Sequence, residues 1–217
     1  PQWNMYTNDM RGVRITLPRR LFKYESLKIP DNFGIQTDGK IISPIPFEQI
    51  FTDDYLILPS FINEHHFARN VEYDKDFIKK KNEAININID KNGRFHANIK
   101  DPTRIATLKS PDWEFQKEFR FVLFILPSIP LPKGQIFDKQ YSERLVQHIA
   151  SCIYNGIGPD LKYFDIELSQ EALEDIIITT GPKCDEGEYT VVNSLIDKFA
   201  PSGKVYKSKF KGTIQNI

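Results

Sequence analysis

The chain has 217 residues, and its 29 basic and 29 acidic side chains cancel to a formal net charge of zero. Hydrophobic residues make up 40% and charged residues 27%, which excludes a chain that is disordered throughout. The zero net charge argues against binding to nucleic acid or acidic lipid through bulk electrostatics. No run approaches the roughly 20 apolar residues of a membrane-spanning helix, so we expect no membrane partner. We predict a single domain over residues 1–217.

In chain order, the first half of the sequence predicts short strands joined by long connections. Alternating apolar residues indicate strands over residues 12–17, 40–43, 54–58 and 84–90, and Asn92-Gly93 predicts a hairpin turn into a strand over 94–99. In the strictly alternating strand 84–90, the pattern predicts that Ile85, Ile87 and Ile89 share a buried face.

The second half predicts longer elements. A strand is expected over 115–126, amphipathic at first and then fully buried, and shorter strands over 164–168, 176–179 and 205–210. Apolar stripes at helical spacing predict helices over 138–153 and 189–199, and Ser169 can cap a short helix that ends at Glu174. Because strands outnumber helices and do not alternate regularly with them, the predicted class is α+β.

The segment 113–120, WEFQKEFR, is the strongest candidate for chemistry. On a strand, Gln116, Glu118 and Arg120 would share one face. A partly desolvated carboxylate between an amide and a guanidinium can bind a sugar hydroxyl and stabilise a cationic carbon. The alternative interpretation is an edge strand on which Glu118 and Arg120 form a structural ion pair.

The aromatic pair Trp3 and Tyr6, which precedes a strand led by Gly12, is a second candidate. Aromatic faces stack on flat rings, so the pair can form the floor of a ligand pocket, although such residues more often belong to a core. The lysine-rich stretches 79–81 and 204–211 are solvated faces or a docking surface for nucleic acid or an acidic partner.

The remaining residues argue against several common classes of site. Cys152 and Cys184 are too few for a disulfide scaffold or a multi-cysteine zinc site, and we expect two buried, reduced thiols in a cytoplasmic protein. Adjacent His65 and His66 lack the HExxH spacing and, on a strand, would point to opposite faces, so we expect no metal. The GxGxxG, P-loop and GxSxG motifs are absent from the sequence, which disfavours the commonest Rossmann, NTPase and hydrolase interpretations.

Several of these segments together resemble a bacterial family, the domain of unknown function numbered 2971. The likeness is carried by Trp3, Tyr6, Gly12 and Val13, by Lys109, Trp113, Glu118 and Arg120, by the block 165–182, and by a terminal strand with Ser208. Gln116 replaces the first glutamate of the family's E-x-E pattern. The family's N-terminal strand-helix segment has no counterpart before Pro1, so we expect that the chain lacks it.

The family in turn resembles ADP-ribosyltransferases, which bind NAD in a cleft between two sheets. This resemblance implies two packed, mainly antiparallel sheets with peripheral helices. It implies NAD as a substrate, with no metal. Residue by residue, it makes Glu118 the catalytic carboxylate and Gln116 the residue that orients the acceptor. Arg120 would fix the Glu118 rotamer or contact a phosphate, and Trp3 or Tyr6 would lie on the nicotinamide side.

The implied function is transfer of ADP-ribose from NAD to a macromolecular acceptor, protein or nucleic acid, or hydrolysis of NAD. Bacterial enzymes of this kind commonly act as toxins or antiphage defence effectors. The main alternative is a non-enzymatic scaffold or sensor module of the same fold that works with a partner protein in a larger complex. Nucleic-acid binding through the lysine-rich strand is a third, less favoured interpretation.

Overall fold

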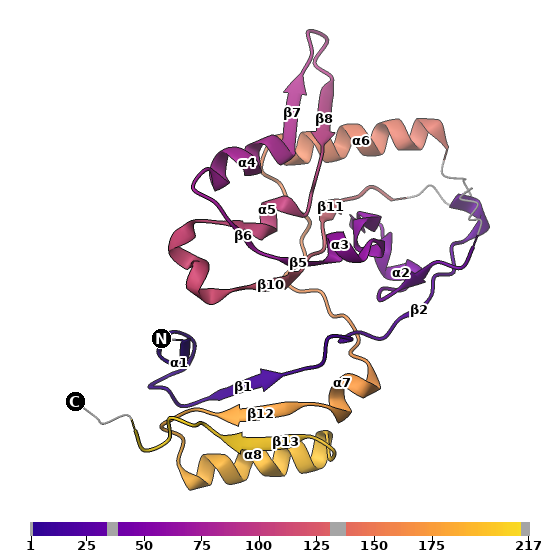
Figure 1. The fold of residues 1–217 in the computed structure, drawn as a ribbon. Helices are drawn as coiled ribbons and strands as arrows, with labels where there is room; N and C mark the ends of the chain where they lie inside the picture. Colours follow the sequence, from indigo (N-terminus) through magenta and orange to yellow (C-terminus); the bar gives the residue numbers. More distant parts are fainter. Residues whose placement is uncertain (1, 34–38, 131–137, 214–217) are drawn as a thin grey trace. The chain divides into compact units, whose positions relative to one another are not determined.

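The computed structural model describes residues 2–33, 39–130 and 138–213, which divide into two compact units (Figure 1). Unit 1 combines the described residues up to Tyr24 with those from Asp165 onward, and unit 2 spans the residues between them. The single domain over residues 1–217 stays a prediction.

Unit 1 is built on one three-stranded sheet of order β1-β12-β13. Its elements are α1 (Gln2–Tyr6), β1 (Val13–Thr16), α7 (Gln170–Glu174), β12 (Ile177–Thr180), α8 (Glu186–Phe199) and β13 (Lys204–Lys207). β12 pairs antiparallel with β1 and parallel with β13. A parallel pair needs a long crossover, and α8 supplies it, running alongside β13 in Figure 1. The first strand of the chain thus pairs with a strand near its end.

The turn that follows β12 explains how the two ends of the chain pack closely. A Cβ added to Gly181 would lie 2.1 Å from the main-chain oxygen of Met10, so only glycine fits there. The thiol of Cys184 donates to the main-chain oxygen of Gly12 at 3.3 Å, and the Gly12 N–H lies 3.4 Å from the same sulfur. A small turn residue and a buried thiol therefore hold the N-terminal segment against the C-terminal one.

Unit 2 consists of short strand pairs and helices. Its strands are β2 (Glu25–Ser26), β3 (Ile42–Ser43), β4 (Tyr55–Ile57), β5 (Ala68–Asn70), β6 (Glu72–Tyr73), β7 (Ile85–Ile89), β8 (Phe95–Ile99), β9 (Leu108–Lys109), β10 (Phe119–Phe121) and β11 (Ile125–Pro127). Its helices are η1 (Asp31–Phe33), α2 (Phe47–Ile50), η2 (Pro59–Ile62), α3 (Glu64–Phe67), α4 (Phe77–Ala84), α5 (Arg104–Thr107), η3 (Pro111–Gln116) and α6 (Lys139–Tyr154). The pairs β2–β3, β4–β11, β5–β10 and β7–β8 are antiparallel, and β6–β9 is parallel.

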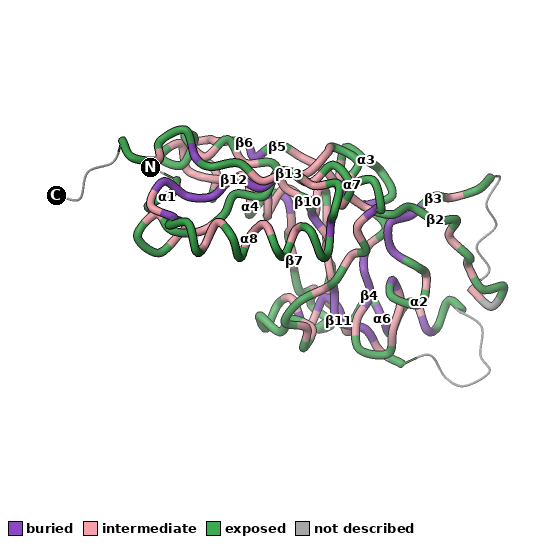
Figure 2. Tube along the Cα trace, turned by 90° about the horizontal axis from the view of Figure 1, so that it is seen from below, coloured by how far each residue is buried: buried purple, intermediate pink, exposed green. Residues whose placement is uncertain are grey.

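The main core of unit 2 lies between α6 and the pair β4–β11. Tyr141, Leu145 and Ile149 recur at intervals of four residues on α6 and pack with Leu56 and Leu126. Figure 2 shows the buried stretches of β4 close to α6 and β11. The Tyr141 hydroxyl donates to the main-chain oxygen of Ile129 at 2.6 Å, so the polar end of this buried ring is satisfied.

Several predicted elements are confirmed, because each rests on a strong local pattern. The α+β class holds, and the expected helices correspond to α6, α7 and α8. Strands β1, β3, β4, β7, β8, β12 and β13 lie within or close to their predicted ranges. The hairpin turn is also confirmed, with Gly93 at a φ of 76°. The finer expectation of two packed sheets of the ADP-ribosyltransferase type stays a prediction.

The predicted long strand over 115–126 is wrong. Pro111, directly after the capping residue Ser110, starts the 3-10 helix η3, which continues through Gln116. Lys117 then adopts a left-handed conformation with a φ of 48°. The strand can begin only at Phe119, and the chain leaves it after Phe121 before β11 starts.

Two smaller predictions are also wrong. Residues 164–168 do not form a strand, since they contribute only the isolated bridge between Leu168 and Phe22. The face of β7 is less buried than its alternation predicts: Ile85 and Ile87 are half-buried and Ile89 is exposed. The hairpin β7–β8 is contacted by α6 and α4, and this packing leaves the end of β7 at Ile89 exposed.

Candidate functional site

The backbone around Glu118 is shaped by the turn that ends η3. The Ser110 hydroxyl accepts from the Asp112 N–H at 3.4 Å at the start of that helix. After the left-handed Lys117, the Glu118 N–H donates to the Tyr73 hydroxyl at 3.0 Å, and its carbonyl accepts from the Val71 N–H at 2.9 Å. These two bonds fix Glu118 beside β6, immediately before β10.

The side chains of Gln116, Glu118 and Arg120 meet, although not as the predicted face of one strand. Lys109, on β9, donates to Gln116 Oε1 at 2.6 Å and forms an ion pair with Glu118 Oε1. Arg120 donates through Nε to Glu118 Oε2 at 2.9 Å. We call these four residues the Glu118 cluster. Lysine thus connects the amide to the carboxylate, and the guanidinium binds the other carboxylate oxygen.

The charges of the cluster keep Glu118 ionised. Its side chain is 23% exposed. The hydrogen bond from Lys109 lowers the pKa of the Glu118 carboxyl below its ordinary value; burial opposes this effect and Arg120 adds to it. Arg120 also donates through Nη1 to the main-chain oxygen of Ala106 at 2.5 Å, which holds its guanidinium in place. The site therefore presents a fixed carboxylate that carries negative charge at neutral pH.

Two exposed aromatic side chains of η3 lie next to the cluster. The Lys109 ammonium is 4.8 Å from the centroid of the Trp113 ring, a cation–π distance. Trp113 stacks on Phe115, with 6.2 Å between centroids and 29° between ring planes. The two residues are 43% and 48% exposed. An aromatic surface that is open to solvent therefore adjoins the charged groups.

Trp3 and Tyr6, the other predicted site residues, lie on α1 of unit 1. Trp3 is half-buried, and its carbonyl accepts from the Thr7 hydroxyl at 2.6 Å. Tyr6 is 66% exposed. Their place in one site with Glu118 stays a prediction, because they belong to a different unit.

Sequence reasoning missed a second charged cluster in unit 2. Glu72, on β6, accepts from Lys80 at 2.7 Å and from Arg104 at 3.2 Å, and Lys80 also pairs with Asp74. The pKa of Glu72 is lowered, first by the hydrogen bond from Lys80. A charge run around 79–81 was the only signal. Glu72 is a close match to Glu118, since each carboxylate is bound by one lysine and one arginine.

The histidines and cysteines give no metal centre among the residues that the structure describes. His65 and His66 lie on the helix α3. Cys152 and Cys184 are buried and free, as expected, and His148 Nε2 lies 3.6 Å from the Cys152 sulfur. Across the described ranges, we find no helix with the length and apolar character needed to cross a membrane.

Comparison with known proteins identifies a family but no individual related protein. Residues 2–121, more than half of the chain, match the family described as "Protein of unknown function (DUF2971)". No curated protein and no solved structure matches. The matched range contains Lys109, Gln116, Glu118 and Arg120, and it ends at Phe121. The chain therefore belongs to the DUF2971 family.

Proposed function

We propose that this chain cleaves NAD, either by transferring ADP-ribose to a macromolecular acceptor or by hydrolysis, with Glu118 as the catalytic carboxylate. The observation that carries the proposal is that Lys109 binds both Gln116 and Glu118, and Arg120 binds Glu118, beside the exposed Trp113. The proposal includes an ADP-ribosyltransferase-like fold. The expected setting is a bacterial toxin or antiphage defence effector.

The residues of the cluster suit the charges of this reaction. Loss of nicotinamide leaves positive charge on the ribose carbon, and an ionised carboxylate stabilises it. Glu118 is ionised, because Lys109 and Arg120 both bind it. Arg120 would hold the carboxylate in place, and Gln116 would orient the acceptor. A ribose hydroxyl that displaced the Lys109 ammonium from Glu118 Oε1 would leave that ammonium free to meet a phosphate.

A second candidate function is a non-enzymatic scaffold or sensor module that works with a partner protein. The specific observation in its favour is that both Glu118 oxygens are already engaged, one by Lys109 and one by Arg120. A carboxylate bound on both sides is also the arrangement of a structural ion pair. The enzyme and the module therefore predict different consequences for the same substitution.

The test is nicotinamide release from NAD by the full chain and by Glu118→Gln, with and without cell extract as a source of acceptor. Removing a group that stabilises charge only in the transition state lowers turnover by about 10²–10³-fold. We expect such a loss in Glu118→Gln.

The matched control is Glu72→Gln, which removes a carboxylate bound by Lys80 and Arg104 in the same unit. We expect this variant to retain turnover within a few fold. Equal losses in the two variants would mean that both act through stability, and the catalytic role of Glu118 would be wrong. No release by folded wild type under either condition would favour the module.

A further inference from the structure

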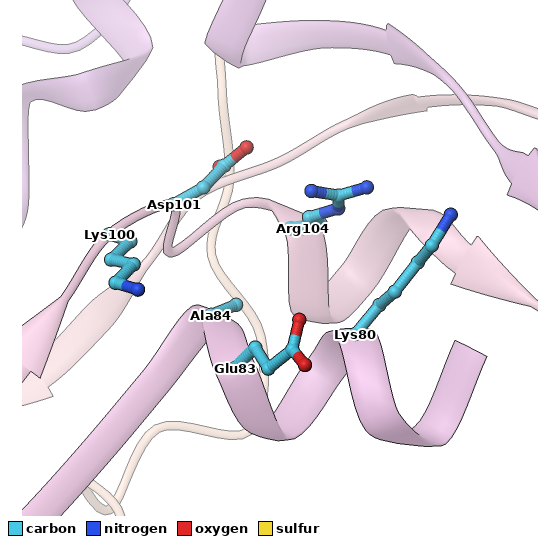
Figure 3. Close-up of a pocket in the computed structure, with 6 residues that line it drawn as sticks. All are labelled: Lys80, Glu83, Ala84, Lys100, Asp101 and Arg104. Carbon is cyan, nitrogen blue, oxygen red and sulfur yellow. The ribbon is translucent and has the colours of Figure 1, made fainter. Parts of the chain in front are cut away.

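Unit 2 contains a cavity of about 130 Å³ beside α4 and α5, shown in Figure 3. One water molecule needs about 10–15 Å³ of such space, so a group as large as a phosphate fits. The cavity is lined by Lys80, Glu83, Ala84, Lys100, Asp101 and Arg104.

Two hydrogen-bond donors that line this cavity have no acceptor among the described residues. Arg104 Nε is buried and has no hydrogen-bond partner within the part of the chain that the structure describes, although NH2 of the same side chain reaches Glu72. The Lys100 side chain is exposed and makes no hydrogen bond or ion pair with a described residue. Burying a donor without a partner is unfavourable, so a group such as Arg104 Nε usually binds water, an ion or a ligand.

The other charged residues of the lining differ in what they leave open. Asp101 accepts from Arg69 Nη1 at 2.9 Å and 3.1 Å and from the Thr103 hydroxyl at 2.8 Å, and in Figure 3 its carboxylate points away from α4. Lys80 is paired with Glu72 and Asp74. Glu83, by contrast, extends from α4 toward α5, below Arg104 in the view of Figure 3. The open groups are therefore two cationic donors and one carboxylate.

We propose that this cavity binds the oxyanion group of a small ligand, a phosphate or a carboxylate, with Arg104 and Lys100 as donors. An arginine and a lysine supply the charge-assisted hydrogen bonds that such groups prefer. The Glu83 carboxylate opposes a highly charged anion and can accept from a hydroxyl of the same ligand. The site does not depend on NAD cleavage, because its donors lie outside the Glu118 cluster.

The experiment is calorimetric titration of the full chain, in buffer of low ionic strength, with inorganic phosphate and, in a second arm, with acetate. We expect saturable binding. The probe that binds more tightly shows whether the natural ligand presents a phosphate or a carboxylate group. Lys100→Gln should weaken binding by about 10-fold, because it removes a charge-assisted hydrogen bond to the anion. Arg104→Lys should weaken it at least as much. Glu83→Gln should tighten the binding of phosphate several-fold.

The matched control is Lys79→Gln, which removes an exposed lysine of α4 that does not line the cavity. The affinity of this variant for phosphate and acetate should stay within about twofold of that of wild type. The proposal is overturned if wild type shows no saturable binding of either probe. Equal weakening by Lys79→Gln and Lys100→Gln would overturn it too, since binding would then depend on surface charge alone. The Lys100 side chain makes no hydrogen bond or ion pair with a described residue, so its variant tests the site even if Arg104→Lys unfolds.

Discussion

At the scale of single residues, the Glu118 cluster shows how a correct set of residues can follow from a wrong local structure. The sequence pattern predicted that Gln116, Glu118 and Arg120 lie together, because they would share one face of a strand. The structure brings them together because Lys109 bridges the turn after η3 to Glu118. Lys109 could not be found by periodicity, since it reaches the site through the parallel pairing of Tyr73 with Lys109 between β6 and β9.

Glu186 gives a residue-scale prediction about pH. Hydrogen bonds from Lys207 and Lys211 lower the pKa of its carboxyl from 4.5 to about 2. Because the folded-state pKa lies below the unfolded one, its stabilising contribution is complete above about pH 4.5 and is lost as the pH falls toward 2. Glu186→Gln should therefore lower the urea midpoint at pH 7, and the difference from wild type should vanish near pH 2. A difference that stayed constant from pH 7 to pH 2.5 would contradict this account.

At the scale of elements, helices with a cap and an apolar stripe could be predicted from the sequence. Ser169 caps α7 as expected, with its hydroxyl accepting from the Ala172 N–H at 3.0 Å and donating to the Arg20 carbonyl at 3.1 Å. The failed strand over 115–126 has a different cause. Its apolar pattern was read correctly, but Pro111 and the left-handed Lys117 determine the backbone, and only tertiary pairing of β10 with β5 shows where the strand begins.

The cap of α7 can be tested directly. Ser169→Ala removes an acceptor for a helical N–H and a donor to Arg20, so we expect a loss of about 1–2 kcal/mol in the free energy of unfolding. Chemical denaturation measures it. Ser194→Ala is the control, because that exposed hydroxyl donates within α8, to the Thr190 carbonyl, and has no other partner in the described ranges. Its change should be within about 0.5 kcal/mol. Equal effects of the two substitutions would show that the cap does not stabilise α7.

At the scale of the whole molecule, unit 1 joins segments that are far apart in the sequence. β1 lies within the range matched by the family, whereas its partner β12 lies beyond it. No sequence pattern predicts this pairing, because β1 is exposed along its length and its alternation is shared by several other strands. The matched range 2–121 therefore omits the strand on which β1 depends.

Gly181 tests how closely the two ends of the chain must pack. Gly181→Ala would force a methyl group to within 2.1 Å of the Met10 carbonyl oxygen, so we expect a loss of about 2–3 kcal/mol in the free energy of unfolding. Gly158→Ala is the control, because a Cβ there meets nothing within 4 Å. If both variants unfold at the wild-type denaturant concentration, the packing of Met10 on Gly181 is not needed for stability.

Nicotinamide release from NAD by the purified full chain is the first experiment to make, because the proposed role of Glu118 in NAD cleavage depends on it. We expect release by wild type, in the presence of cell extract or without it, and a decrease of about 10²-fold or more in Glu118→Gln. If wild type and a folded Glu118→Gln variant release nicotinamide at the same rate, Glu118 is not the catalytic carboxylate.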